Sequence, residues 1–96
     1  MLLRGRHEVV LEKERVKLVP KRGWIRSEAV EVRYLDVVGI SIVEARSRER
    51  GKFTLRLVDG SDITTTFPRR ATLKMKAVQH RAWKRVRAAR AASEER

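Results

Sequence analysis

The residues in this chain that could do chemistry are mainly cationic, and they are concentrated toward the C-terminus. Between residues 69 and 90 the sequence holds nine Lys or Arg side chains and no Asp or Glu. Over the whole chain 24 basic residues oppose 12 acidic ones, which gives a formal net charge of +12. Because a strong positive field attracts polyanions and speeds their association, the composition predicts an anionic partner.

Catalytic chemistry has few candidate residues. The chain has no cysteine, which excludes disulfides, a thiolate nucleophile and cysteine-bound metals. His7 and His80 are far apart in the sequence, and neither lies beside a carboxylate cluster with metal-ligand spacing. Asp59 and Asp62 flank a turn and are interpreted as turn formers. The glycines are scattered singly, so no glycine loop is available to hold a phosphate. We expect a protein that is not an enzyme and needs no metal or cofactor.

The C-terminal cations need an element that holds them in a row, and the apolar residues between them predict a helix over residues 72–92. At about 100° per residue, apolar side chains fall on the same side as Met75; they are Ala71, Val78, Ala82, Val86 and Ala89. Most of the basic side chains fall on the opposite side. We expect the helix to pack by its apolar stripe, to leave its basic side in solvent, and to be followed by a frayed tail over residues 93–96.

The candidate anion-binding residues are eight cations on and just before this helix: Arg69, Arg70, Lys74, Lys76, Arg81, Lys84, Arg85 and Arg87. A charged helix face is often only solvated, but this one has no acidic residue at i+4 to offset repulsion of a few tenths of a kcal/mol per pair. Its first turn also carries Lys74 and Lys76, although the helix dipole disfavours cations there. An anion would remove both penalties. The free N–H groups after Thr72 would complete a phosphate site with the nearby cations.

A second candidate site is a basic loop that also carries an indole ring. Its residues are Lys21, Arg22, Trp24 and Arg26. Three roles are open for Trp24, because an indole can stack on a nucleobase, insert into a membrane interface, or pack against the protein's own sheet.

Residues 7–67 alternate apolar and polar side chains, with turn residues every eight to twelve positions. This pattern is typical of antiparallel strands. The clearest strand begins at Phe53 and leads to Asp59-Gly60, a pair that favours a type I′ hairpin turn because both central positions need positive φ. We expect about six strands in a sheet or barrel, with Tyr34, Phe53 and Phe67 in its core, and a single domain over residues 1–96.

Two segments carry a family resemblance. They are Tyr34-Leu35-Asp36-Val37-Val38-Gly39-Ile40 and Gly51-Lys52-Phe53-Thr54-Leu55-Arg56-Leu57-Val58-Asp59-Gly60. With the terminal helix, they make residues 9–86 resemble the small bacterial pleckstrin-homology-like (PH-like) domains. The resemblance implies an α+β fold, in which a strongly bent antiparallel sheet or partly open barrel of about six strands is closed at one end by one C-terminal amphipathic helix. A full barrel of this family has seven strands.

The resemblance also implies a range of partners, because members of this family bind phosphoinositides, peptides or other proteins. In lipid-binding members a basic first loop grips inositol phosphates, and Lys17, Lys21, Arg22 and Arg26 are similar to that loop. A fold shared by so many binding functions does not select one of them.

Three functions remain open at this point. The first is a binding module for nucleic-acid phosphates without strong sequence specificity. The second is a peripheral membrane domain that binds anionic lipid headgroups. The third is an interaction or assembly subunit that docks an acidic protein or pairs with itself through a strand edge.

The sequence also predicts where the protein resides. No apolar run approaches the roughly 18 residues that span a bilayer, and the first residues do not resemble a signal peptide. Together with the lack of cysteine, this predicts a soluble cytoplasmic protein.

Overall fold

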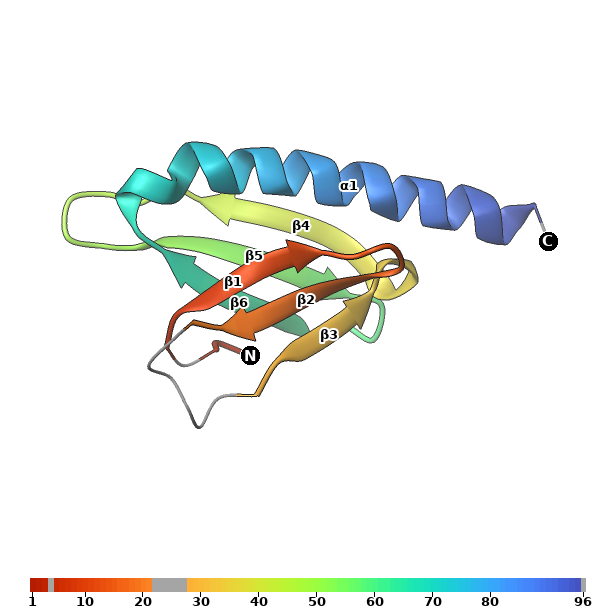
Figure 1. Cartoon of the computed structure of the whole chain (residues 1–96), viewed down its shortest axis with the longest axis horizontal. Coiled ribbons are helices and arrows are strands. Elements are labelled where there is room, and N and C mark those ends of the chain that lie inside the picture. The colour runs from red at the N-terminus through yellow and green to blue at the C-terminus, as the bar shows by residue number, and fades with distance from the viewer. Residues whose placement is uncertain (4, 22–27, 96) are drawn as a thin grey trace.

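A computed structural model of the chain describes residues 1–3, 5–21 and 28–95 (Figure 1). These residues form six β-strands, two short 3-10 helices and one α-helix. The strands are β1 (His7–Leu11), β2 (Arg15–Pro20), β3 (Val30–Arg33), β4 (Val37–Val43), β5 (Gly51–Leu57) and β6 (Asp62–Phe67), and the helices are η1 (Tyr34–Asp36), η2 (Arg69–Ala71) and α1 (Thr72–Glu94). The α+β class, the strand number and the C-terminal helix predicted from the sequence are confirmed.

The strands form two antiparallel sheets of three, β1-β2-β3 and β4-β5-β6, where one bent sheet or a partly open barrel was expected. The break lies at η1, between β3 and β4. The Tyr34 backbone N–H donates to Glu14 O (3.2 Å) and its hydroxyl donates to Glu12 O (2.6 Å), so this turn is held against the β1–β2 hairpin. The chain therefore leaves the first sheet at η1 and begins the second. Figure 1 shows the two sheets one behind the other, with α1 lying along their upper side.

Strand β4 contains an irregularity that keeps its apolar residues buried. Val37 and Ile40 are both buried although three positions separate them, and Val38 between them is 41% exposed. Regular alternation would put Val37 and Ile40 on opposite faces. A register shift in the pairing with β5 lies between Val37 and Gly39, and such a bulge returns Ile40 to the core face.

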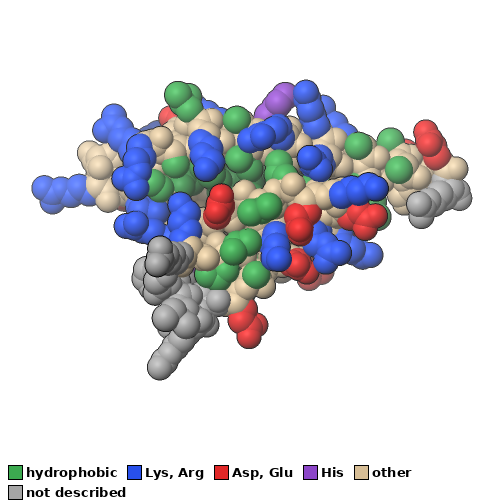
Figure 2. Space-filling view, in the orientation of Figure 1, with side chains coloured by type: hydrophobic (Ala, Val, Ile, Leu, Met, Phe, Trp, Pro, Cys, Tyr) green, Lys and Arg blue, Asp and Glu red, His purple; other side chains and the backbone are tan. Residues whose placement is uncertain are grey.

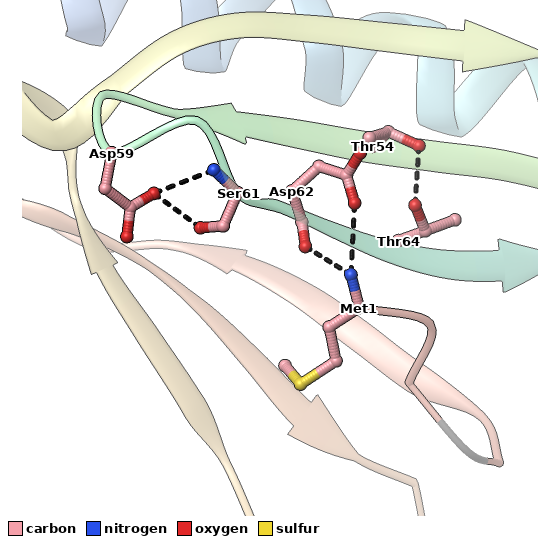
Figure 3. A network of polar contacts seen from close by, with 6 residues as sticks. All are labelled: Met1, Thr54, Asp59, Ser61, Asp62 and Thr64. Carbon is pink, nitrogen blue, oxygen red and sulfur yellow. Dashed lines mark hydrogen bonds and ion pairs between the residues drawn. The ribbon is translucent and has the colours of Figure 1, made fainter.

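The turn between β5 and β6 differs from the predicted type I′ turn. Gly60 has a φ of 89°, but Asp59 does not have a positive φ. The Leu57 N–H donates to Ser61 O (2.8 Å), which encloses a loop of residues 58–60. One left-handed residue at the end of such a loop is the usual three-residue hairpin. The Asp59 carboxylate accepts the Ser61 N–H at 2.9 Å, so Asp59 is the turn former that its position predicted (Figure 3).

One hydrophobic core joins both sheets and α1. Tyr34, Phe53 and Phe67 lie in it, as predicted. The apolar stripe of α1 is also confirmed, since its buried side chains are Met75, Val78, Ala82 and Val86. The helix continues to Glu94, two residues beyond its predicted end, so Ser93 and Glu94 are helical rather than frayed. Arg96 lies outside the described residues.

The first three residues run parallel to β6. Leu2 pairs with Thr64, and the Leu3 N–H donates to Thr64 O at 2.8 Å. The Met1 ammonium group lies 3.0 Å from Asp62 Oδ1 (Figure 3). This segment therefore covers the outer edge of the second sheet. In the part of the chain that the structure describes, no helix combines the length and the apolar character needed to cross a bilayer.

Candidate anion-binding site

The basic side of α1 faces solvent. On α1 the buried side chains are Met75, Val78, Ala82 and Val86, and the cations lie at other positions of the helix; Lys74, Lys76, Arg81, Lys84, Arg85 and Arg87 are all exposed. We call these six residues the helix row. Their exposure follows from the helical spacing, and it leaves their ammonium and guanidinium groups accessible to an anion.

Two members of the helix row already have partners within the protein. Lys76 forms an ion pair with Glu44, which follows β4. Hydrogen bonding to Lys76, together with its positive charge, lowers the pKa of the Glu44 carboxyl. Arg85 donates from Nη1 to Glu12 O at 3.0 Å. The expectation of an uncompensated basic face is thus wrong at Lys76, because the compensating acid comes from another element rather than from i+4 on the helix.

The rest of the helix row is less engaged. Within residues 1–3, 5–21 and 28–95, no carboxylate forms an ion pair with Lys74, Arg81, Lys84 or Arg87. Arg87 lies over the Trp83 ring, with 6.0 Å between the guanidinium carbon and the ring centroid. This contact at i and i+4 orients the guanidinium without neutralising it.

A second group of cations surrounds a pocket at the N-terminal end of α1. Among the residues that the structure describes, five exposed cations line it: Arg6, Lys21, Arg50, Arg70 and Lys74. The pocket has a volume of about 70 Å³. In Figure 2, Lys and Arg side chains gather over the end of the molecule where α1 begins. We call these five residues the pocket cations; Lys74 belongs to both groups, so the helix row begins at the pocket.

The pocket differs in part from the phosphate site predicted at the helix N-terminus. Arg70 and Lys74 line it as expected, but Arg69 and Lys76 do not. The Thr72 N–H is not free, because η2 precedes the helix and this N–H donates to Arg69 O. No side chain caps α1. The pocket instead has cations from three other parts of the chain, Arg6, Lys21 and Arg50, in place of Arg69 and Lys76.

Sequence reasoning missed Arg6 and Arg50, although strand register contains a signal for both. His7 pairs with Pro20 in the β1–β2 hairpin, so Arg6 lies opposite Lys21, and the Lys21 N–H donates to Arg6 O at 2.8 Å. Gly51 pairs with Phe67 in the β5–β6 hairpin, so Arg50 lies near the residues that enter η2. Extending each hairpin by one position brings like charges together at one end of the molecule.

The basic loop can be followed only in part. Lys21 is a pocket cation, whereas Arg22, Trp24 and Arg26 lie outside the described residues. Lys17 lies 3.7 Å from Glu31, which offsets its charge. The two histidines are on different elements, with His80 exposed on α1 and His7 buried on β1.

Comparison of the chain with protein-family models, with curated proteins and with solved structures finds no match.

Proposed function

We propose that this protein is a non-enzymatic binding module for nucleic-acid phosphates. The observation that carries the proposal is the helix row, which begins at the pocket and keeps at least four cations free of described carboxylates. From Lys74 to Arg87 the helix advances by about 20 Å. Along that length one strand of duplex DNA carries about six phosphates, which is enough charge for the cations on one side of the helix; Lys76 and Arg87 lie on the side away from Lys74 and Arg85.

The type of side chain favours weak sequence specificity. Lys and Arg contacts to phosphate fix position and orientation but carry no information about the bases. The one amide side chain on α1 is Gln79, whose Nε2 donates to Ile40 O at 2.8 Å, so it is engaged within the protein rather than free to read adenine in the major groove. We therefore expect similar affinity for duplexes of different sequence.

The test is the salt dependence of binding to a mixed-sequence duplex between 50 and 200 mM salt. We expect the logarithm of the affinity to fall linearly with the logarithm of salt concentration, with a slope of about −0.9 for each phosphate contacted. The double substitution Lys84→Gln/Arg87→Gln should weaken binding and reduce the slope by about 2, because two phosphate contacts are lost.

The matched control is Lys13→Gln, which removes one positive charge on the β1–β2 turn. Lys13 lies among Glu12, Glu14 and Glu31, where a polyanion is repelled. We expect the affinity and the salt slope of the Lys13→Gln variant to stay close to those of the unmodified protein. Binding that is flat across this salt range, or binding to anionic lipid vesicles with none to nucleic acid, would overturn the proposal.

In the same assay, we expect the substitution Glu44→Gln to increase the affinity for the duplex. The ion pair with Glu44 occupies Lys76 in the free protein, so removing the carboxylate releases one more cation of the helix row. We expect tighter binding and a slope steeper by up to about 0.9. An unchanged slope would show that Lys76 does not reach a phosphate.

We also propose a PH-like relationship for the fold. Six antiparallel strands in two facing sheets, followed by a C-terminal helix on the shared core, support it. The chain has six strands in its described part against seven in a full barrel of that family. The relationship does not select the partner, so the proposed function depends on the cations alone.

A further inference from the structure

Two residues that line the pocket each carry a buried polar atom with no hydrogen-bond partner in the described part of the chain. His7 is 7% exposed and Thr65 is 1% exposed, and both residues line the pocket. His7 Nδ1 and Thr65 Oγ1 find no donor or acceptor among the described residues. Buried polar side-chain atoms in folded proteins nearly always have a partner, so this pair makes the pocket a candidate site for a ligand that supplies one.

The positions of these residues are unusual for their types. Thr65 lies between Ile63 and Phe67 on the buried face of β6, where each of its neighbours on that face is apolar. Val has nearly the same shape as Thr and would fill this place without a polar atom. An unpaired hydroxyl at this buried position lowers the stability of the fold. A ligand in the pocket that bonds to the hydroxyl would explain why Thr is present instead of Val.

The positive charge around the pocket is a second, independent observation, and it favours an anionic ligand. Among the described residues, five cations and one acid, Glu8, line it, and none of the five forms an ion pair with a described carboxylate. Arg50 donates from Nε to Thr66 Oγ1 at 3.1 Å, which leaves its other N–H groups available. A water molecule in the pocket would not offset these charges, whereas an anion beside His7 and Thr65 would be attracted by them.

We propose that the pocket binds a single terminal phosphate group, a phosphomonoester dianion. Its volume of about 70 Å³ exceeds the roughly 10–15 Å³ that one water needs. Residues from β1, β6, η2 and α1 surround it, so a group with one covalent attachment enters more readily than a phosphodiester, whose chain continues on two sides. The doubly charged group also matches the excess of cations. If the molecule that bears this phosphate is a nucleic-acid strand, the inference rests on the proposed function.

The first experiment uses inorganic phosphate and the backbone amide NMR signals of the full chain. We expect saturable shifts centred on the amides of residues 7, 65 and 70. Thr65→Val and Arg70→Gln should each weaken phosphate binding by about tenfold, the effect of losing one good polar contact. Arg70 is exposed, so Arg70→Gln keeps the test valid if Thr65→Val fails to fold. The control Lys13→Gln removes the same charge from the β1–β2 turn, outside both the pocket cations and the helix row, and should leave phosphate binding unchanged.

The second experiment compares two oligonucleotides that differ only in a 5′-phosphate or a 5′-hydroxyl. We expect the phosphorylated strand to bind about tenfold more tightly and Arg70→Gln to abolish most of that difference. Lys84→Gln should weaken both strands equally. If neither strand binds while phosphate still shifts the pocket amides, the proposed function fails and the pocket proposal stands for a smaller phosphomonoester. Equal affinity for both strands, with phosphate shifts absent from the pocket, would overturn the pocket proposal.

Discussion

At the scale of single residues, Tyr34 connects the two halves of the molecule. The residue is 1% exposed, and its hydroxyl donates to Glu12 O at 2.6 Å. The same carbonyl accepts Arg85 Nη1 at 3.0 Å. Burial raises the pKa of Tyr34 above its ordinary value of 10.0, against the lowering effect of Arg85. The folded state therefore favours the neutral phenol.

We expect Tyr34→Phe to lower the free energy of unfolding at pH 7 by about 1 kcal/mol, because Glu12 O keeps its bond from Arg85. The stabilisation from the raised Tyr34 pKa is complete below pH 10 and is lost as the pH rises through the folded-state pKa. The difference in stability between the two proteins should therefore shrink above pH 10. Urea unfolding followed by circular dichroism from pH 7 to 11 measures it, and a difference that grows with pH would contradict this account.

Residue types alone predicted which aromatic side chains are buried but not which cations meet. Tyr34, Phe53 and Phe67 could be assigned to the core because alternation along a strand fixes which side chains face inward. The meeting of Arg6 with Arg70 depends on how two hairpin ends and η2 are placed in space. Local periodicity contains no such information. The sequence therefore predicted Lys21, Arg70 and Lys74 as site residues but not Arg6 and Arg50.

At the scale of elements, glycine in β5 marks a close contact between strands. A Cβ added at Gly51 would lie 2.3 Å from Cε2 of the Phe67 ring and 2.9 Å from Val43 O. Phe67 is itself a core residue, so its ring has little room to move. At Gly39 in β4, the nearest atom to an added Cβ is Arg56 Cβ at 3.5 Å, an ordinary contact.

We expect Gly51→Ala to destabilise the protein by about 1–3 kcal/mol through overpacking. The control Gly39→Ala makes the same chemical change in a strand and should alter stability by about 0.5 kcal/mol or less. Urea unfolding of both variants gives the comparison. Equal effects would show that strand propensity, rather than the Phe67 contact, determines the cost.

The elements themselves were largely predictable, because the period of two in residues 7–67 changes to a helical period after Pro68. The structure differs from the predicted elements where a single residue alters the local backbone conformation. The bulge at Val37–Gly39 and the three-residue loop ending at Gly60 depend on pairing with β5, and the local sequence allowed a regular strand and a tighter turn as well.

At the scale of the whole molecule, α1 connects two sheets that are separate in their hydrogen bonding. It contacts β1 in the first sheet, β4 in the second, and both 3-10 helices. Val86 is fully buried in the core that these elements share. Removal of this packing should therefore affect both sheets together.

We expect Val86→Ala to lower the free energy of unfolding by about 1–3 kcal/mol. Amide hydrogen exchange should show reduced protection in the central strands β2 and β5 by similar factors. The control Val58→Ala deletes the same atoms from a side chain that is 66% exposed and should change stability by about 0.5 kcal/mol or less. Protection lost from one sheet and kept in the other would show that the sheets unfold independently.

The division into two sheets was not predictable from alternation. Each strand was recognisable, but whether β3 pairs with β4 is determined at η1, where Tyr34 turns inward and Val37 begins a new sheet. The family resemblance favoured a continuous bent sheet at this point. In the structure, η1 packs against the β1–β2 hairpin, about 20 residues earlier in the chain. This contact separates β3 from β4, so that two sheets form.

The contact between Trp83 and Arg87 makes the helix row optically observable. The chain has two tryptophans, so Trp24→Phe would leave the indole of Trp83 as the only one. A phosphate that draws the Arg87 guanidinium off the ring changes the polarity around that fluorophore. Its emission would then report occupancy of the row directly, without a label, and separately from events in the pocket at the N-terminal end of α1.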